Sequence, residues 1–268
     1  MIAEIRKLIF RNRFSLYFRN SLNLRPVDTY YPKDIKASVS DFFFWKSNLN
    51  FDTKFMLTNV SSHIIPKKHQ NDEVQILIFN KDGKILKEIK YDLMPFESKE
   101  IIFSQEKVNG YGSFFVFHNF KYLDSLLEQG SHVAERGYVG YKKGNNIWNF
   151  MHGNYNACYL TNKKKIESII SRSFFYQTYS PQIIFNDTKK FEIIINNPTK
   201  FKNKFTIFNF DNENNLINKK TVFLDPFNTE IFQYKDTITH YIKINSKILF
   251  CRPIIYKEYE TYFDIFHG

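Results

Sequence analysis

Histidine and carboxylate side chains lie close together in one part of this sequence. His118, His132, Glu135 and His152 all fall in a short stretch near its middle. Neutral imidazoles together with a carboxylate are the ligand types that zinc and similar divalent ions take. Their spacing matches no standard motif such as His-Glu-x-x-His. The four residues are therefore the candidate ligands of a divalent metal such as zinc, a cofactor that would make the protein a metal-dependent hydrolase or isomerase.

A second set of side chains in the same stretch is suited to a sugar-containing or anionic small molecule. Aromatic faces combined with hydrogen-bonding tips are what sugar rings bind. The candidate ligand-binding residues are Arg136, Tyr138, Tyr141, Trp148, His152 and Asn154. Ordinary β cores contain the same residue types, so a ligand site and a packed core both stay open as interpretations.

Signatures of other chemistry are missing from the sequence. It has no Gly-x-Ser-x-Gly nucleophile turn and no glycine-rich phosphate loop. The closely spaced glycines at 110–112 and 137–140 lie in strand-like surroundings, where glycine more often marks a bulge. The sequence therefore favours a non-catalytic binding or assembly protein without a cofactor, with the metal-dependent enzyme as the alternative.

The stretch 141–153 recurs in altered form at 256–268. Seven positions match at a constant separation of 115 residues, namely Tyr141 and Tyr256, Lys142 and Lys257, Trp148 and Phe263, Asn149 and Asp264, Met151 and Phe266, His152 and His267, and Gly153 and Gly268. Each copy ends in His-Gly. A glycine at the end of a strand is typical where the backbone takes a conformation that other residues avoid. The chain therefore contains one unit twice.

Earlier parts of the two copies match at a larger separation. Leu93 and Pro95 precede Leu224 and Pro226 by 131 residues. The first copy therefore holds 16 more residues than the second, around 120–136. The leucine spacing there, followed by glycine, predicts a short inserted helix.

The composition and the turn signals predict the fold class. Thirty Phe and seventeen Tyr favour pleated sheets, and Lys81-Asp82-Gly83-Lys84 is typical of a hairpin turn. Many short strands separated by frequent turns are characteristic of β-sandwiches. We therefore expect a mostly β protein of two tandem duplicated antiparallel β-sandwich-like domains. The expected boundaries are 1–40 for a basic N-terminal helix or arm, 41–160 for the first domain with its insertion, and 161–268 for the second.

Three short motifs in the second copy carry a family resemblance. They are Asn196-Asn197-Pro198, Leu224-Asp225-Pro226 and the strand-like run 244–248 leading to Arg252. Through them the segment 185–256 resembles the small β-sandwich proteins of the sensory rhodopsin transducer type. The resemblance implies a small binding sandwich that oligomerises, and it transfers no functional residue.

Charge and cysteine content bear on partners and location. The net charge is +11, yet Lys, Asn and Ile are abundant throughout, as AT-rich codon usage produces, and no nucleic-acid-binding motif is present. The expected partners are a small molecule or glycan and further copies of the chain, not nucleic acid. The only two cysteines, Cys158 and Cys251, indicate a reducing compartment, so we expect a cytoplasmic protein.

The first twenty residues have apolar residues at helical spacing with arginines between them. A basic amphipathic helix of this kind either packs on its own protein or lies on a membrane surface. No apolar run approaches the 18 residues of a spanning helix, so no transmembrane segment is expected.

Overall fold

The computed structural model describes residues 5, 9, 12–22, 35–65, 69–128, 132–135, 137–170, 172–185, 188–235, 238–248 and 252–268. Strands make up 59% of the structure and helices 8%, so the prediction of a mostly β protein is confirmed. The named helices are α2 (Arg13–Ser21), α3 (Val60–Ile64) and α4 (Leu123–Glu128). The helix α4 lies inside the inserted stretch where the leucine spacing predicts one. No helix in the described ranges is long and apolar enough to span a bilayer.

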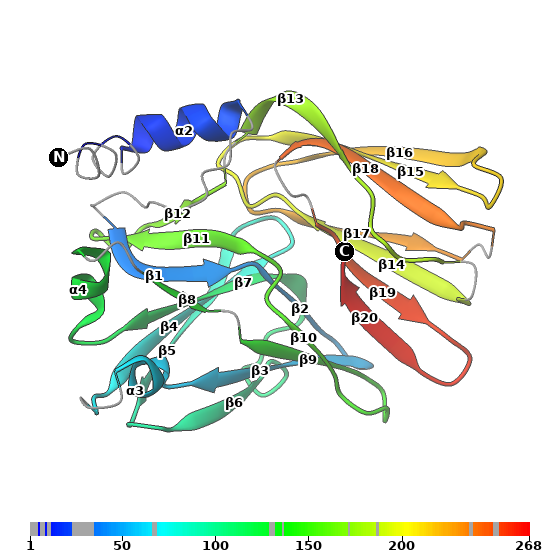
Figure 1. Ribbon diagram of the computed structural model, residues 1–268. Coiled ribbons are helices and arrows are strands. Elements are labelled where there is room, and N and C mark those ends of the chain that lie inside the picture. Colours follow the sequence, from blue (N-terminus) through cyan, green and yellow to red (C-terminus); the bar gives the residue numbers. More distant parts are fainter. Residues whose placement is uncertain are drawn as a thin grey trace.

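Within the described residues, twenty strands form five four-stranded sheets (Figure 1). Sheet I has the order β12-β11-β1-β8, built from β1 (Ile35–Asp41), β8 (Val133–Glu135), β11 (Asn156–Thr161) and β12 (Ile166–Ser168). Sheet II has the order β2-β7-β4-β5, built from β2 (Phe43–Ser47), β4 (Asp72–Asn80), β5 (Ile85–Leu93) and β7 (Gly110–Asn119). Sheet III has the order β10-β9-β3-β6, built from β3 (Phe51–Thr58), β6 (Ser98–Ile102), β9 (Tyr138–Lys143) and β10 (Asn149–His152).

The second half of the chain supplies the other two sheets. Sheet IV has the order β13-β18-β15-β16, built from β13 (Arg172–Tyr179), β15 (Asn203–Phe210), β16 (Leu216–Leu224) and β18 (Tyr241–Ile248). Sheet V has the order β17-β14-β19-β20, built from β14 (Lys190–Asn196), β17 (Thr229–Tyr234), β19 (Ile254–Glu258) and β20 (Phe263–His267). Sheet IV repeats the strand order of sheet II, and sheet V repeats that of sheet III.

The sheets do not form the two separate sandwich domains that the sequence predicts. They are arranged as the blades of a five-bladed β-propeller (Figure 1). The reason lies in sheet V, which is buried on both faces. In β14, Ile193 and Ile195 pack in a core shared with sheet IV, whereas Ile194 packs in a second core with Phe51 and other residues of the first half. A sandwich domain standing alone would leave one face of this sheet in water.

Polar and backbone contacts also join the two halves. The Lys46 ammonium lies 2.9 Å from the buried carboxylate of Glu192. The turn after β4 pairs with the second half through a bridge between Asp82 and Asn228. Gly83 in that turn has φ of 69°, and a Cβ atom there would lie 2.3 Å from a backbone carbonyl oxygen of the second half. The halves therefore fold as one body with a shared core.

An asparagine repeated in both halves fixes the chain just beyond β3 in the first half and just beyond β14 in the second. Asn59 follows β3, and its Nδ2 donates to the backbone carbonyls of Gln70, Leu93 and Met94. Asn197 follows β14, and its Nδ2 donates to the backbone carbonyls of Phe201, Leu224 and Asp225. Both side chains are fully buried. The duplicated sequence therefore repeats its tertiary hydrogen bonds as well as its strands.

Candidate functional site

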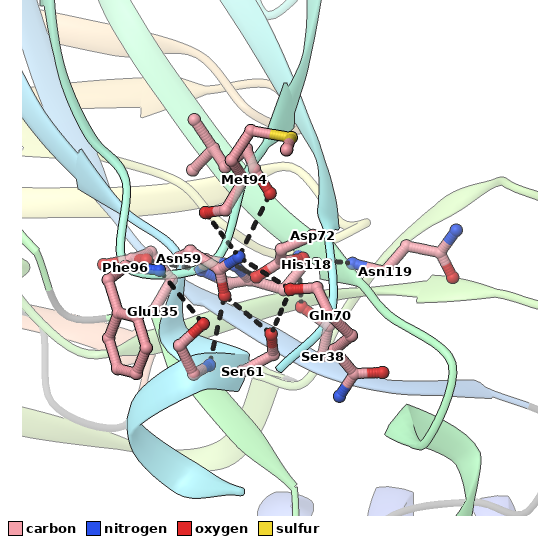
Figure 2. A network of polar contacts seen from close by, with 12 residues as sticks. Ser38, Asn59, Ser61, Gln70, Asp72, Met94, Phe96, His118, Asn119 and Glu135 are labelled. Atoms are coloured by element: carbon pink, nitrogen blue, oxygen red, sulfur yellow. Dashed lines mark hydrogen bonds and ion pairs between the residues drawn. The ribbon is translucent and has the colours of Figure 1, made fainter. Parts of the chain in front are cut away.

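A cluster of ionisable side chains in the interior is centred on His118 of β7. Its Nδ1 lies 2.8 Å from a carboxylate oxygen of Asp72, the first residue of β4. Its Nε2 lies 2.5 Å from a carboxylate oxygen of Glu135, the last residue of β8. Figure 2 shows the imidazole held between the two acids. All three side chains are buried.

The two carboxylates determine the charge of the imidazole. Burial by itself lowers the pKa of His118, but the hydrogen bonds and negative charges of Asp72 and Glu135 outweigh this effect and raise that pKa to about 10. The residue is therefore an imidazolium at neutral pH. Because both ring nitrogens donate to carboxylates, neither can accept a proton or bind a metal ion. The cluster joins sheet I to sheet II instead of offering a catalytic base.

Backbone groups complete the surroundings of this cluster. The backbone amide of His118 donates to Ser38 Oγ at 2.8 Å, and the amide of Asn119 donates to Asp72 at 3.1 Å. The second oxygen of Glu135 accepts from the amide of Gly137. Backbone amides thus hold one oxygen of each acid, and Ser38 of β1 holds the backbone of the residue that carries the imidazole.

The four predicted metal ligands do not come together. His118 and Glu135 meet, but in the closed ion cluster. His132 stands just before β8, where burial lowers its pKa, and His152 contacts a different histidine. Across the described ranges, no group of three or more His, Cys, Asp or Glu side chains is arranged to hold a metal ion. The third member of the ion cluster is Asp72, which was not among the predicted residues.

His152 and His267, the matched ends of the repeat, touch each other. Their Nε2 atoms are 2.9 Å apart, and the ring centres are 4.3 Å apart. His152 Nδ1 lies 2.7 Å from the carbonyl oxygen of Gly153, so this nitrogen carries a hydrogen and donates it. His152 Nε2 is then the acceptor for the Nε2–H of His267. The prediction placed the two residues at the ends of separate sandwiches, whereas the edge strands β10 and β20 bring them into contact.

Two of the predicted ligand-binding residues are part of the core. Tyr141 is buried, and its hydroxyl donates to the carbonyl oxygen of Phe44 at 2.9 Å. Asn154 is buried, and its Nδ2 donates to the carbonyl oxygen of Arg252 at 2.9 Å. Both therefore hold backbone in place and cannot contact a ligand from solvent.

The remaining described residues of the predicted ligand-binding set do not belong to the core. Tyr138 is 60% exposed on β9, and Arg136 lies outside the described residues. Trp148, just before β10, lines a hollow of about 400 Å³. The lining residues are Asn48, Leu49, Asn50, Phe51, Asp52, Ile102, Ser104, Gln105, Lys142, Gly144 and Trp148. Among the described members of the predicted set, Trp148 thus lines a cavity.

The hollow combines an indole with cations and amides. The ammonium groups of Lys54 and Lys142 lie 4.8 and 6.0 Å from the ring centre of Trp148. Asp52 accepts hydrogen bonds from the backbone amide and hydroxyl of Ser104, which fixes the floor between β3 and the turn after β6. Two of the amide-bearing residues, Asn48 and Asn50, come from the turn between β2 and β3, and the third, Gln105, comes from the turn after β6. Neither turn carries a sequence pattern that indicates binding.

The same positions in the second copy are closed. Lys257 corresponds to Lys142 and is 5% exposed, and its ammonium donates to the carbonyl oxygen of Ile184 at 2.7 Å. Phe263 corresponds to Trp148, is 1% exposed and packs against Phe51 and Tyr256. The repeat therefore keeps a cation and an aromatic ring in both copies, but only the first copy presents them to an open cavity.

No protein-family model matches this chain, and no curated protein matches it at a significant level. The resemblance of the second copy to the sensory rhodopsin transducer type stays a prediction. The function is therefore inferred from the geometry of the Trp148 hollow.

Proposed function

We propose that the protein is a non-catalytic binding protein that holds an acidic sugar in the Trp148 hollow. The observation that carries the proposal is the difference between the two copies. Trp148 and Lys142 line an open cavity, whereas their counterparts Phe263 and Lys257 are buried. The same two positions therefore form a binding surface in the first copy and part of the packed interior in the second.

The chemistry of the hollow fits such a ligand. The flat indole of Trp148 can stack on the C–H face of a pyranose ring. Side-chain amides of Asn48, Asn50 and Gln105 lie around the cavity and can bond hydroxyl groups. The ammonium of Lys142 favours a carboxylate or phosphate on the sugar. A volume of about 400 Å³ is within the usual range for small-molecule sites.

A binding role fits the hollow better than catalysis. Among the described residues that line it, Asp52 alone is acidic, and Asp52 accepts hydrogen bonds from Ser104 and the amide of Thr53. Glycoside hydrolysis by paired carboxylates needs a second acid across the sugar. The metal-dependent hydrolase alternative has no comparable support, because His118 is enclosed by its two carboxylates. A cytoplasmic location, expected from the two cysteines, belongs to the same proposal.

Tryptophan fluorescence tests the proposal directly. The chain has two tryptophans, and Trp45 is fully buried with its indole N–H donating to the carbonyl oxygen of Phe79. A ligand in the hollow therefore quenches or shifts mainly the emission of Trp148. Titration with glucuronate, galacturonate and glucose 6-phosphate should give saturable changes, and neutral glucose should bind more weakly.

Variants identify the site by calorimetry. Trp148→Ala and Lys142→Ala should each weaken binding of the best acidic sugar about tenfold or more, which corresponds to the loss of a stacking or charged contact. Phe150→Ala is the matched control, because Phe150 is 47% exposed on the same hairpin and does not line the hollow. Absence of saturable binding across the panel, or equal binding by Trp148→Ala and the wild type, would refute the proposal.

A further inference from the structure

A second surface, built from elements that do not line the Trp148 hollow, exposes six aromatic side chains. It consists of Phe14, Tyr17 and Phe18 of α2 and Phe174, Phe175 and Tyr176 of β13, here called the aromatic face. The six side chains are between 41% and 74% exposed. Clustered exposed apolar side chains on a folded protein mark a surface that meets another molecule or a membrane.

The two parts of the aromatic face belong to one surface. The Ser21 hydroxyl at the end of α2 donates to the carbonyl oxygen of Arg172 at 3.4 Å. The Ser173 hydroxyl donates to the carbonyl oxygen of Ser21 at 3.3 Å. Figure 1 shows the end of α2 beside β13. The helix and the strand are therefore attached to each other next to their exposed aromatic residues.

The strand exposes its aromatic residues because it leaves its sheet. Arg172 pairs with Ile248 and Gln177 pairs with Ser246, so four residues of β13 stand opposite one residue of β18. A regular strand would bury every second side chain. This bulge instead presents Phe174, Phe175 and Tyr176 consecutively to the outside.

The helix α2 turns its aromatic side away from the rest of the protein. Phe14, Tyr17 and Phe18 share one side at helical spacing, and the rings of Phe14 and Phe18 stack at 6.4 Å. That side is exposed, whereas Arg19 is 8% exposed and its Nε donates to the carbonyl oxygen of Ser15. An amphipathic helix normally turns its apolar side inward and its charges outward.

Cationic groups stand beside the aromatic face. Arg172 is exposed at the start of β13, and the Lys247 ammonium lies 5.1 Å from the ring centre of Tyr176. The whole chain has a net charge of +11. Exposed Phe and Tyr with nearby cations match the headgroup region of a bilayer that contains anionic lipid, where rings enter the interface and cations meet lipid phosphate and carboxylate groups.

We propose that the aromatic face docks this protein on the surface of an anionic membrane. Insertion of aromatic side chains and attraction of basic groups are two separate contributions, and reversible peripheral binding generally needs both. The proposal is independent of the sugar hollow, which is built from other strands.

Vesicle co-sedimentation tests the proposal. Vesicles of phosphatidylcholine with about 30% phosphatidylserine should bind the protein, and vesicles of phosphatidylcholine alone should bind it at least tenfold more weakly. Raising the salt concentration from about 0.1 to 0.5 M should reduce binding several-fold, because screening weakens the charge contribution. All measurements use the full-length chain.

Two variants separate the helix from the strand. Phe14→Ser with Phe18→Ser, and Phe174→Ser with Phe175→Ser and Tyr176→Ser, should each lower vesicle affinity about tenfold. Phe223→Ser is the matched control, since Phe223 is 60% exposed on β16 and lies outside the aromatic face. Each variant should keep the thermal unfolding temperature of the wild type, because the replaced side chains are exposed. If one of the two variants does not fold, the vesicle affinity of the other still tests the proposal.

Three outcomes would overturn the proposal. The first is a wild type that does not bind the anionic vesicles. The second is a folded variant with wild-type vesicle affinity. The third is a dimer of the wild type in analytical ultracentrifugation that becomes monomeric in the β13 variant, because this result would assign the aromatic face to a second copy of the chain.

Discussion

Replacement of His118 should remove a pH-dependent part of the stability. In the folded protein the pKa of His118 is about 10, compared with about 6.5 for an unfolded histidine. Because the folded-state pKa is raised, the stabilisation by the imidazolium is fully present below pH 6.5 and is lost as the pH rises through 10. The difference between the two values corresponds to about 5 kcal/mol in total, with a slope of about 1.4 kcal/mol per pH unit between them.

The assay is urea unfolding of the wild type and His118→Asn at pH 7, 8 and 9. Asparagine keeps a donor for one carboxylate but has no charge, so the variant should be about 3 to 5 kcal/mol less stable at pH 7, the cost of leaving buried carboxylates without their cation. The difference between the two proteins should shrink by roughly 3 kcal/mol from pH 7 to pH 9, since the wild type loses its imidazolium contribution over that range. Taking the difference cancels the titration of groups that lie away from the cluster and are unaffected by the substitution.

His69→Asn is the control, because His69 is exposed and contacts neither acid. It should keep the pH dependence of the wild type. A constant difference between the wild type and His118→Asn from pH 7 to pH 9 would contradict a charged His118. It would mean that a carboxyl group, not the imidazole, carries the proton in the cluster.

Two further predictions concern the duplicated backbone contacts. Asn59→Ala and Asn197→Ala should each lower the free energy of unfolding by about 3 kcal/mol, because three backbone carbonyls lose the donor that a fully buried side chain supplies. Asn245→Ala, which removes an exposed hydrogen bond, should change the free energy of unfolding by less than about 0.5 kcal/mol, and equal losses in urea unfolding would contradict this prediction. Gly83→Ala should lower the thermal unfolding temperature more than Gly144→Ala, since both glycines have positive φ but only Gly83 faces backbone of the other half. A larger drop in unfolding temperature for Gly144→Ala than for Gly83→Ala would show that the turn contact between the halves is not tight.

The repeat could be predicted from the sequence because it depends on local signals. Matching turns and matching aromatic residues recur at constant separations, and strands form between turns in either copy. The stacking of the sheets could not be predicted in the same way. The run of three isoleucines from Ile193 to Ile195 does indicate a strand buried on both faces, but it does not identify the sheets that cover it.

The candidate site was predictable only in part. His118 and Glu135 were selected by residue type and do meet, but their partner Asp72 is a single aspartate at the start of a strand, with no local signal for burial. Trp148 was selected as an aromatic residue and does line a cavity. The amides of Asn48 and Asn50 come from a turn about a hundred residues earlier, and the pairing of β3 with β9 brings that turn near Trp148.

The contact between His152 and His267 has a consequence for how this chain relates to an assembly of separate copies. Equivalent residues that touch each other are what an isologous dimer places on its two-fold axis. Here a covalent connection joins the two units, so their effective concentration is fixed by the chain and does not fall on dilution. With pairing secured, the two copies no longer have to be identical. One can keep its aromatic residue and lysine open to a cavity while the other buries both.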